Sequence, residues 1–467
     1  MVDAAPTMPP TGETRTLLSF VAGLSWHDLD DEVRHAACRH LLDTVGVMVA
    51  GCAGDVAARL DGVLAAVRPD GAVPVPGRTR RVDALDAAHL GGTGAHGIEL
   101  DDGYRQGSVH PGVAVVPALL VQAHGRQVSG VRLLEALVAG YETVTAVART
   151  CHPDLRQRGF HPTGCVGPLG AAMAVGRLAG LDEAGLGHAL GLAASGAGGL
   201  FAFLGGGGDV KRLHAGHAAR EGLTATLLAV GGVGGPPDVL EAADGFFQAF
   251  AFGRDARARR LTLPPAAPFG ITDCYIKPYA CCRHIQPAVE ALMGLVAEHD
   301  LNADIVEAIE VETYAIAAKH GDTGWSDFAS AQLSFPFIMA LGLARGAITL
   351  SDFTPQVRQS PALAAIGARV SVRVDPDLDR LYPDFRPARV TVRTLGGTFV
   401  REAKEALGSR LVPFDDAGLH GKFRSLVAPV LGTEAAERLL VELLAVEESA
   451  DVSSLLELAA LPADAVP

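Results

Sequence analysis

The sequence predicts a mainly α protein, in which a large all-helical domain is interrupted by an inserted smaller α/β (α+β) domain. Helical periodicity runs almost without a break from about residue 14 to residue 260. Strand patterns appear only beyond a proline-rich stretch at 261–270, and helical patterns return near the C-terminus. Because 467 residues exceed one ordinary hydrophobic core, two or three domains are expected. The predicted bounds are 1–265 for the first part of the helical domain with a loose tail at 1–14, 266–405 for the α/β domain, and 406–467 for the rest of the helical domain.

The predicted helices of the first domain combine helical spacing of apolar residues with capping residues. Four are predicted, at 31–51, 129–150, 163–180 and 215–232. Asp30 or Asp31 is expected to cap the first of these and Ser129 the second. All four are rich in alanine and glycine, and small side chains allow helices to approach closely.

The predicted α/β domain rests on period-two strand patterns. Strands are predicted at 306–314, 368–374 and 388–394, and the last continues into LGGTFVREA, which indicates a Gly-Gly hairpin with a return strand. Helices are predicted at 287–298 and 333–344 within this domain, and at 418–431 and 433–460 after it. We expect the last two to rejoin the first domain.

Composition excludes several classes of protein. The net charge is −14 without a basic block, so nucleic-acid binding is not expected. No window approaches eighteen uninterrupted apolar residues, so no membrane span is predicted, and the N-terminal tail lacks the features of a signal peptide. Seven scattered cysteines without a CxxC pair indicate neither a disulfide framework nor a zinc ribbon. These features predict a cytoplasmic protein.

Two glycine-rich stretches match nucleotide-binding motifs only superficially. GTGAHG at 92–97 follows a helical pattern rather than a strand, and GGGGDVK at 205–211 lacks the P-loop spacing. The sequence also lacks HExxH, GxSxG and EF-hand motifs. We therefore expect no nucleotide or redox cofactor.

The stretch HGIELDDGYRQGSVHPG at 96–112 concentrates chemistry-bearing residues. It contains the carboxylates Glu99, Asp101 and Asp102 together with two histidines. Further ligands at metal-binding spacing are not evident, so no metal is predicted. Proton transfer combined with anion binding is the better interpretation.

Two His-Pro steps lie in otherwise glycine-rich loops, at His110 and His161. Proline is favoured at the first helical position, which places the preceding histidine near the N-cap. The positive end of the helix dipole there lowers the pKa of an imidazole and attracts carboxylates. A third His-Pro step, at His152, is expected to be only a helix start.

Two further segments carry candidate binding groups. Lys211 and His214 follow the four-glycine run, where a ligand can approach the backbone closely; the alternative is a solvated basic corner. In IKPYACCRHIQPAVEAL, Lys277, Arg283 and His284 crowd the entrance to a helix. The paired cysteines at 281 and 282 could be nucleophiles, but we favour small buried residues.

Seven segments, in this order, resemble the MmgE/PrpD family, which includes 2-methylcitrate dehydratase, cis-aconitate decarboxylase and iminodisuccinate epimerase. They are HGIELDDGYRQGSVHPGVAVVPAL, SGVRLLEALVAGYE, GFHPTGCVGPLGAAMAVGRLAGLD, KRLHAGHAAREG, GPPDVLEAADGFFQAF, KPYACCRHIQPAVEAL and AQLSFPFIMALGLARGAITLSDF. The resemblance implies a helical domain with a smaller α/β lid and a homodimer. It also implies cofactor-free and metal-free chemistry on small di- and tricarboxylates.

The resemblance assigns roles to single residues. His110, His161 and Lys211 match the family's functional positions, and the acidic trio matches its aspartates, with Glu99 where aspartate is usual. Gly103 stands where dehydratases and decarboxylases carry a threonine, and Phe337 where the decarboxylase branch often carries a tyrosine. These two differences argue against cis-aconitate as the substrate. Tyr104 and Arg105, in the same divergent loop, are predicted to contact the substrate.

The resulting expectation is a cofactor-independent lyase that dehydrates or decarboxylates a small polycarboxylate. Lys211, His161 and Arg283 are expected to hold carboxylates, while His110 or His161 moves a proton at the adjacent carbon. Glu99 or Asp102 is expected to orient the imidazole. An epimerase of a small dicarboxylate is the alternative, and a binding or structural protein on an inherited fold is the third.

Overall fold

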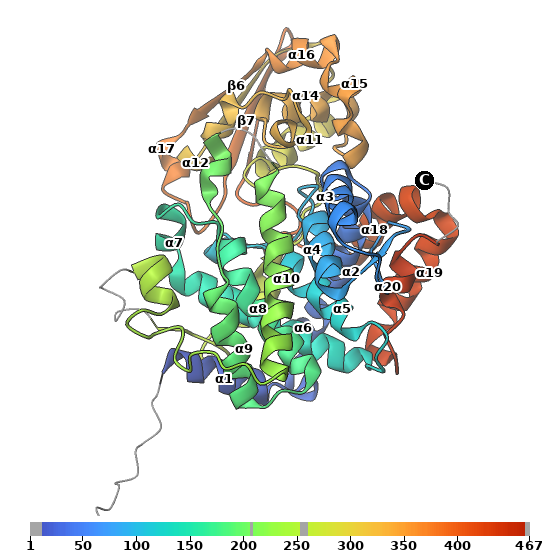
Figure 1. Cartoon of the computed structure of the whole chain (residues 1–467). Helices are drawn as coiled ribbons and strands as arrows, with labels where there is room; N and C mark the ends of the chain where they lie inside the picture. The colour runs from blue at the N-terminus through green and yellow to red at the C-terminus, as the bar shows by residue number, and fades with distance from the viewer. Residues whose placement is uncertain (1–11, 206–208, 253–259, 463–467) are drawn as a thin grey trace, which may run out of the picture. The chain divides into compact units, whose positions relative to one another are not determined.

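The computed structural model describes residues 12–205, 209–252 and 260–462. Helices hold 59% of the residues and strands 9%, so the chain is mainly α as predicted. It divides into two compact units (Figure 1). The first consists of residues up to Gly97, Asp102–Cys274 and the chain from Phe423 onward; the second consists of Ile98–Asp101 and Tyr275–Lys422. The sequence placed the corresponding boundaries at 265/266 and 405/406, and it did not separate 98–101 from its neighbours.

The first unit is built from helices. They are α1 (Glu13–Gly23), α2 (Asp31–Cys52), α3 (Asp55–Val67), α4 (Ala84–Ala95), α5 (Gly112–Ala123), α6 (Gly130–Cys151), α7 (Asp154–Gln157), α8 (Pro162–Ala179), α9 (Glu183–Ser195), α10 (Val210–Val230), α19 (Thr433–Leu444) and α20 (Leu455–Ala459). A short hairpin of β1 (Val73–Pro74) and β2 (Arg81–Val82) joins them. The helix α18 (Asp416–Leu431) contains the boundary between the units.

Several helix starts follow the predicted capping chemistry. The side chain of Asp30 accepts a hydrogen bond from the backbone N–H of Val33, at 2.9 Å, at the start of α2. Ser129 caps α6 in the same way. His161 is the N-cap of α8 with proline at the first helical position, as predicted. At the other His-Pro step the cap of α5 is Pro111, so His110 lies one residue farther out than predicted.

Close helix packing forms the core of the first unit. The helices α5 and α8 are almost wholly buried, and α8 packs against α6, α9 and α10 (Figure 1). A Cβ atom added to Gly170 of α8 would come within 2.2 Å of a Val144 methyl group and 2.8 Å of the Gly140 carbonyl oxygen. At the α8–α10 contact, a Cβ on Gly222 would lie 2.4 Å from that of Ala171. The glycines therefore set the distance between these helices.

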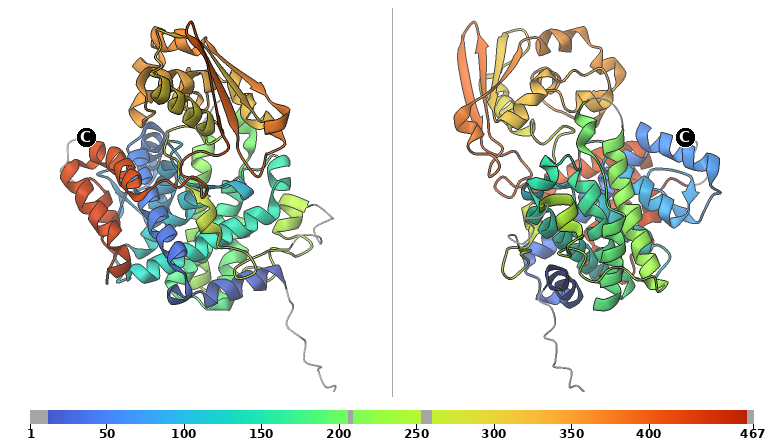
Figure 2. Two further views of the ribbon diagram at one scale, coloured as in Figure 1. Left: turned by 180° about the vertical axis from the view of Figure 1, so that it is seen from behind. Right: turned by 60° about the vertical axis from the view of Figure 1, so that its left-hand side comes forward.

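The second unit contains a four-stranded sheet in the order β6 (Val370–Val374), β5 (Val306–Thr313), β7 (Ala388–Thr394) and β8 (Gly397–Ala403). The β5–β6 pair is parallel and the other two pairs are antiparallel, with β7 and β8 forming the predicted hairpin. The helices α11 (Gln286–His299) and α14 (Phe335–Arg345) pack against the sheet (Figure 2). The buried residues of β5 and β7 face this helical layer.

Two predicted helices differ from those observed. The helix predicted at 433–460 breaks after Leu444, and a 3₁₀ turn and a loop separate it from α20. In this loop the carboxylate of Asp451 accepts hydrogen bonds from the N–H groups of Ser453 and Val128, so short polar side chains replace helical bonding. The helix predicted at 215–232 begins earlier, as α10 at Val210, so Lys211 lies in a helical first turn rather than in a loop.

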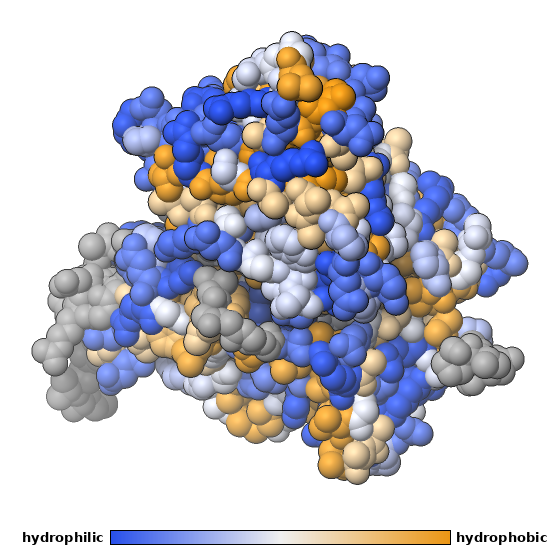
Figure 3. Space-filling model, turned by 90° about the horizontal axis from the view of Figure 1, so that it is seen from above, coloured by the Kyte–Doolittle hydropathy of each residue, from blue (hydrophilic) through white to orange (hydrophobic). Residues whose placement is uncertain are grey.

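No single helix among the described residues is long and apolar enough to cross a membrane, although α2 and α3, bent by 67°, pass such a test as a pair. On the face shown in Figure 3, hydrophilic residues are interspersed with hydrophobic ones.

Candidate active site

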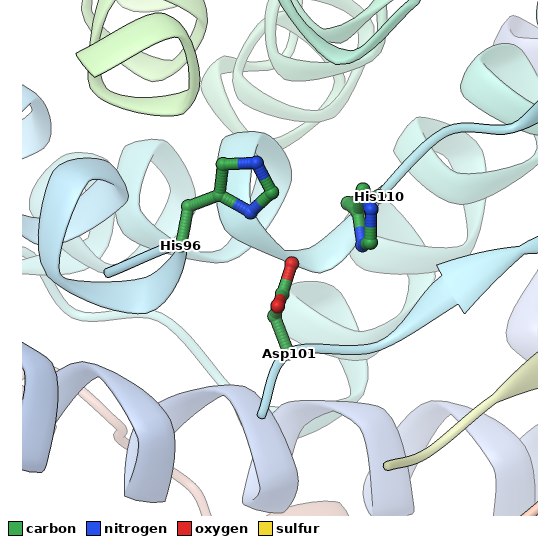
Figure 4. Close-up of side chains that lie close together, drawn as sticks. All are labelled: His96, Asp101 and His110. Atoms are coloured by element: carbon green, nitrogen blue, oxygen red, sulfur yellow. The ribbon is translucent and has the colours of Figure 1, made fainter. Parts of the chain in front are cut away.

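Four imidazoles and one ammonium group gather in the first unit, and we call this group the basic cluster. His96 follows α4, His110 precedes α5, His161 caps α8, and His214 and Lys211 lie near the start of α10. The ring centroids are 4.9 Å apart for His96 and His110, 5.8 Å for His96 and His161, and 5.1 Å for His161 and His214. Figure 4 shows how the rings of His96 and His110 project from separate segments. Four helix termini thus bring together groups that are far apart in the sequence.

His161 is a deeply buried base of the basic cluster, with 2% of its surface exposed. Its Nδ1 lies 3.0 Å from Nδ1 of His214, and its ring meets the edges of Phe201 and Phe203. Burial lowers the pKa of His161 well below its ordinary value, and the neighbouring basic groups of the cluster lower it further. His161 is therefore neutral at physiological pH.

His110 is half-buried, and a hydrogen bond sets its orientation. Its Nδ1 lies 2.6 Å from the backbone carbonyl oxygen of Asp102. Because a carbonyl oxygen only accepts, we assign the proton of neutral His110 to Nδ1. The lone pair then resides on Nε2, as a general base requires.

The side chain of Asp102 does not orient this imidazole, which corrects the prediction from the sequence. Its carboxylate is fully buried and accepts hydrogen bonds from the Tyr141 hydroxyl at 2.8 Å and the Gly112 N–H at 3.1 Å. Its other contact is Nδ1 of His40, at 3.1 Å. The carboxylate thus fixes the start of α5, while the carbonyl of the same residue orients His110.

The loop after Asp102 contains two residues that were predicted to contact the substrate, Tyr104 and Arg105. The structure gives them different surroundings. Tyr104 is 1% exposed; its hydroxyl donates to Gln106 at 2.9 Å and accepts from Arg149 at 3.0 Å. This placement assigns Tyr104 to the structure of the loop, contrary to the prediction. Arg105 is half-buried at the start of a short 3₁₀ helix (Arg105–Gly107), and its contact with substrate stays a prediction.

The start of α10 presents Lys211 beside the histidines. Lys211 is half-buried and close enough to lower the pKa of His161. The next residue, Arg212, is buried and donates to the carbonyl oxygen of Gly97 at 2.9 Å and to Asp209 at 3.0 Å. Arg212 therefore ties the start of α10 to the segment that carries His96.

In the second unit, Lys277 pairs with two members of the acidic trio. Its ammonium group, 1% exposed, lies 2.9 Å from a carboxylate oxygen of Asp101 and 3.5 Å from one of Glu99. Burial opposes the charged form, but the two carboxylates outweigh it, and the pKa of Lys277 is raised. Glu99 has a left-handed backbone, with φ of 55°. The trio is therefore split, with Asp102 in one unit and Glu99 and Asp101 in the other.

The other predicted binding residues of the second unit have structural partners. Arg283 is buried, donates to Gln286 and to the carbonyl oxygens of Ala406 and Leu407, and stacks on Tyr275. These contacts hold the guanidinium group in place, and its role as a carboxylate ligand stays a prediction.

His284, a predicted binding residue, and Phe337, which differs from the family's tyrosine, also lie in the second unit. His284 is half-buried, and its Nδ1 shares a hydrogen bond with the Tyr314 hydroxyl. Phe337 is fully buried and packs against Trp325 and Phe353, so its difference from tyrosine concerns the core rather than an exposed site.

His96 is the member of the basic cluster that sequence reasoning missed. The sequence alone assigns it no role, because the motif that contains it, GTGAHG at 92–97, is typical of a flexible turn. The structure places this motif at the end of α4, where His96 is fully buried.

His96 and His110 are also the two groups of this unit most suited to a metal. Catalytic zinc sites use three protein ligands, which this pair alone does not supply. Figure 4 also labels Asp101, which belongs to the second unit. The chemistry of the basic cluster itself, with neutral imidazoles beside an ammonium group, is suited to carboxylate binding and proton transfer.

Comparison with known proteins agrees with this chemistry. The chain is 27% identical to a cis-aconitate decarboxylase-like protein of Aspergillus oryzae, over 96% of this chain and 98% of that protein. It is 25% identical to cis-aconitate decarboxylase of Aspergillus terreus, over 98% of both chains. It is 27% identical to the human enzyme of that name, over 95% of this chain and 93% of the relative.

Family models cover both parts of the chain. Residues 15–259 match the MmgE/PrpD N-terminal domain, and residues 279–448 match the MmgE/PrpD C-terminal domain. The family and these relatives identify the chain as a lyase. The predicted resemblance is therefore confirmed, and the chain belongs to the MmgE/PrpD family.

Proposed function

We propose that the chain is a cofactor-independent lyase that decarboxylates or dehydrates a small di- or tricarboxylate, with the basic cluster as its acid–base site. The observation that carries this proposal is the buried, neutral His161 surrounded by three imidazoles and Lys211. Burial and the neighbouring basic groups hold down the pKa of His161, and a bound carboxylate would offset this effect.

Substrate binding and proton supply are then the same event. A carboxylate beside Lys211 and His161 favours the protonated imidazole and so raises its pKa. In a decarboxylation, the C–C bond to carbon dioxide breaks, its electron pair stays on the carbon, and the imidazolium proton replaces the lost carboxylate. In a dehydration, His110 Nε2 takes the proton beside a carboxylate, and the imidazolium protonates the departing hydroxyl group.

Decarboxylation is the reaction to test first, because the compared relatives are named cis-aconitate decarboxylases. The buried position of Phe337 weakens one of the two sequence arguments against that substrate. Gly103 remains the other, so the panel includes substrates of the dehydratase and epimerase branches.

The test is proton NMR in D₂O of the purified enzyme with cis-aconitate, 2-methylcitrate, citrate and iminodisuccinate. Loss of a carboxylate with one deuterium at that carbon supports decarboxylation, and a new alkene supports dehydration. Deuterium exchange without other change would instead support the epimerase. Turnover is expected to fall at least about 100-fold in His110→Asn and His161→Asn, matching the usual contribution of general acid–base catalysis.

A matched control is available on α9. His188 is exposed and contacts only Gly235 among the described hydrogen bonds, so His188→Asn is expected to retain full activity. If the three variants lose activity equally, or if none loses it, the basic cluster is not the site of chemistry.

Assembly and location are part of the proposal. The family resemblance favours a homodimer, which light scattering of the purified chain tests directly. All seven cysteines are free, which suits a reducing compartment such as the cytoplasm.

A further inference from the structure

The second unit contains a cysteine that the proposed chemistry does not use. Cys282 is half-buried, and its Sγ lies 3.9 Å from Nε2 of His320. The adjacent Cys281 is fully buried. The expectation that both are small buried residues is thus confirmed for Cys281 and wrong for Cys282.

Neighbouring rings hold His320 in place beside the sulfur. It stacks on His284 with 6.0 Å between centroids, and Nδ1 of His284 shares a hydrogen bond with the Tyr314 hydroxyl. Tyr314 is fully buried and stacks on Tyr382 at 4.8 Å. His284, Tyr314 and Tyr382 thus form a row of rings beside His320.

The charges around Cys282 favour ionisation. Burial raises its pKa, but the His320 imidazole and a backbone N–H near His284 outweigh burial, so the net pKa lies below the ordinary thiol value. Glu99 is the carboxylate that opposes this effect. Burial and Cys282 itself raise the pKa of the neighbouring Cys281, which therefore stays protonated.

We propose that Cys282 and His320 form a thiolate–imidazolium pair and that Cys282 is a modification site for small electrophiles, hydroperoxides in particular. The thiolate attacks one peroxide oxygen and the O–O bond breaks. The departing oxygen takes the proton of the His320 imidazolium, which leaves a cysteine sulfenic acid, a neutral imidazole and an alcohol or water. Sulfur loses two electrons and the peroxide gains them.

The chain contains a matched control thiol. Cys38 is also half-buried, but burial, with Glu447 and Glu448 nearby, raises its pKa to about 12. A thiol with its pKa below 9.0 has a thiolate fraction at pH 7 at least about 1,000-fold larger than that of Cys38. The lower nucleophilicity of the weaker base removes about half of this advantage on a logarithmic scale. Cys282 is therefore expected to react at least about 30-fold faster than Cys38.

The experiment treats the whole protein with iodoacetamide at pH 7 and quantifies each cysteine-containing peptide by mass spectrometry over time. We expect Cys282 to react at least about 30-fold faster than Cys38. The His320→Asn variant is expected to slow labelling of Cys282 by about tenfold without changing that of Cys38. With hydrogen peroxide, a sulfenic-acid trap is expected to mark Cys282 and not Cys38.

The labelling of Cys38 also reports whether a variant is folded, because unfolding would expose this thiol. If His320→Asn accelerates Cys38, the His320→Gln variant replaces it in the comparison. Equal rates for Cys282 and Cys38 in the unmodified protein would overturn the proposal. An unchanged Cys282 rate in a folded His320 variant would overturn it as well.

Discussion

Removing the His161 imidazole is expected to abolish the proton uptake that accompanies binding of a polycarboxylate. In the unliganded protein His161 is neutral, because burial and its basic neighbours lower its pKa well below the ordinary value. A carboxylate about 4 Å away contributes about 4 kcal/mol at an effective dielectric constant of about 20. That energy corresponds to an upward shift of about 3 pKa units. The pKa of His161 should therefore be higher in the bound form than in the unliganded protein.

Isothermal titration calorimetry measures this uptake when one ligand is titrated in two buffers with different ionisation enthalpies. Tricarballylate is a suitable probe, because it carries three carboxylates but neither an alkene nor a hydroxyl group. At pH 6 we expect measurable proton uptake on binding by the unmodified protein and by His188→Asn. Uptake by His161→Asn is expected to be near zero. If that variant takes up as many protons as the unmodified protein, the assignment of the linked proton to His161 is refuted.

Three further predictions concern stability, each measured by urea unfolding. Gly170→Ala should destabilise the protein by about 1–3 kcal/mol, since its Cβ would collide with neighbouring helices. Gly62→Ala, in open space on α3, should stabilise by about 0.5–1 kcal/mol, so equal effects would contradict the packing argument. Glu142 is buried with its pKa raised to about 7, so the folded state holds a proton that the unfolded state releases above about pH 4.3. Its contribution is present at low pH and is lost as the pH rises through 7, and Glu142→Gln should gain about 2 kcal/mol relative to the unmodified protein between pH 5 and 7.5. If the difference in unfolding free energy between Glu142→Gln and the unmodified protein were the same at pH 5 and pH 7.5, Glu142 would not be the group responsible. Burial lowers the pKa of His89 to about 3, so its contribution is present at neutral pH and is lost below about pH 6.5. His89→Gln should therefore gain about 2 kcal/mol of stability relative to the unmodified protein on going from pH 7.5 to pH 5. A loss relative to the unmodified protein would contradict the assignment.

Local chemistry explains which features of the fold could be predicted from the sequence. Asp30 and Ser129 cap their helices through backbone groups three residues away, so the sequence contains the whole interaction. The strand β7 and its return strand also depend on a local turn. By contrast, the break after α19 depends on the contact between Asp451 and Val128, residues separated by more than three hundred positions. Such a contact cannot be recognised from helical periodicity.

The candidate site also combines features set by local sequence with features set by distant contacts. His110 and His161 were recognisable because each precedes a proline near a helix start, and Lys211 because it follows a run of glycines. His96 was not, because its role depends on where the end of α4 meets the start of α8. Sequence adjacency was misleading for the acidic trio, since the consecutive residues Asp101 and Asp102 have different partners: Asp101 pairs with Lys277, and Asp102 is bonded to Tyr141.

The charge of the whole chain helps to explain why a neutral His161 is useful at the site. A net charge of −14 opposes an anionic substrate, but solvent ions screen surface charges beyond about 8 Å at physiological ionic strength. Permanent positive charges buried at the site would attract substrate but would also repel one another and cost stability. Neutral imidazoles avoid that cost until a carboxylate arrives, and the proton taken up then serves as the acid for the reaction. On the proposed function, affinity for substrate should therefore fall as the pH rises above neutrality, while the unliganded protein keeps its stability over the same range.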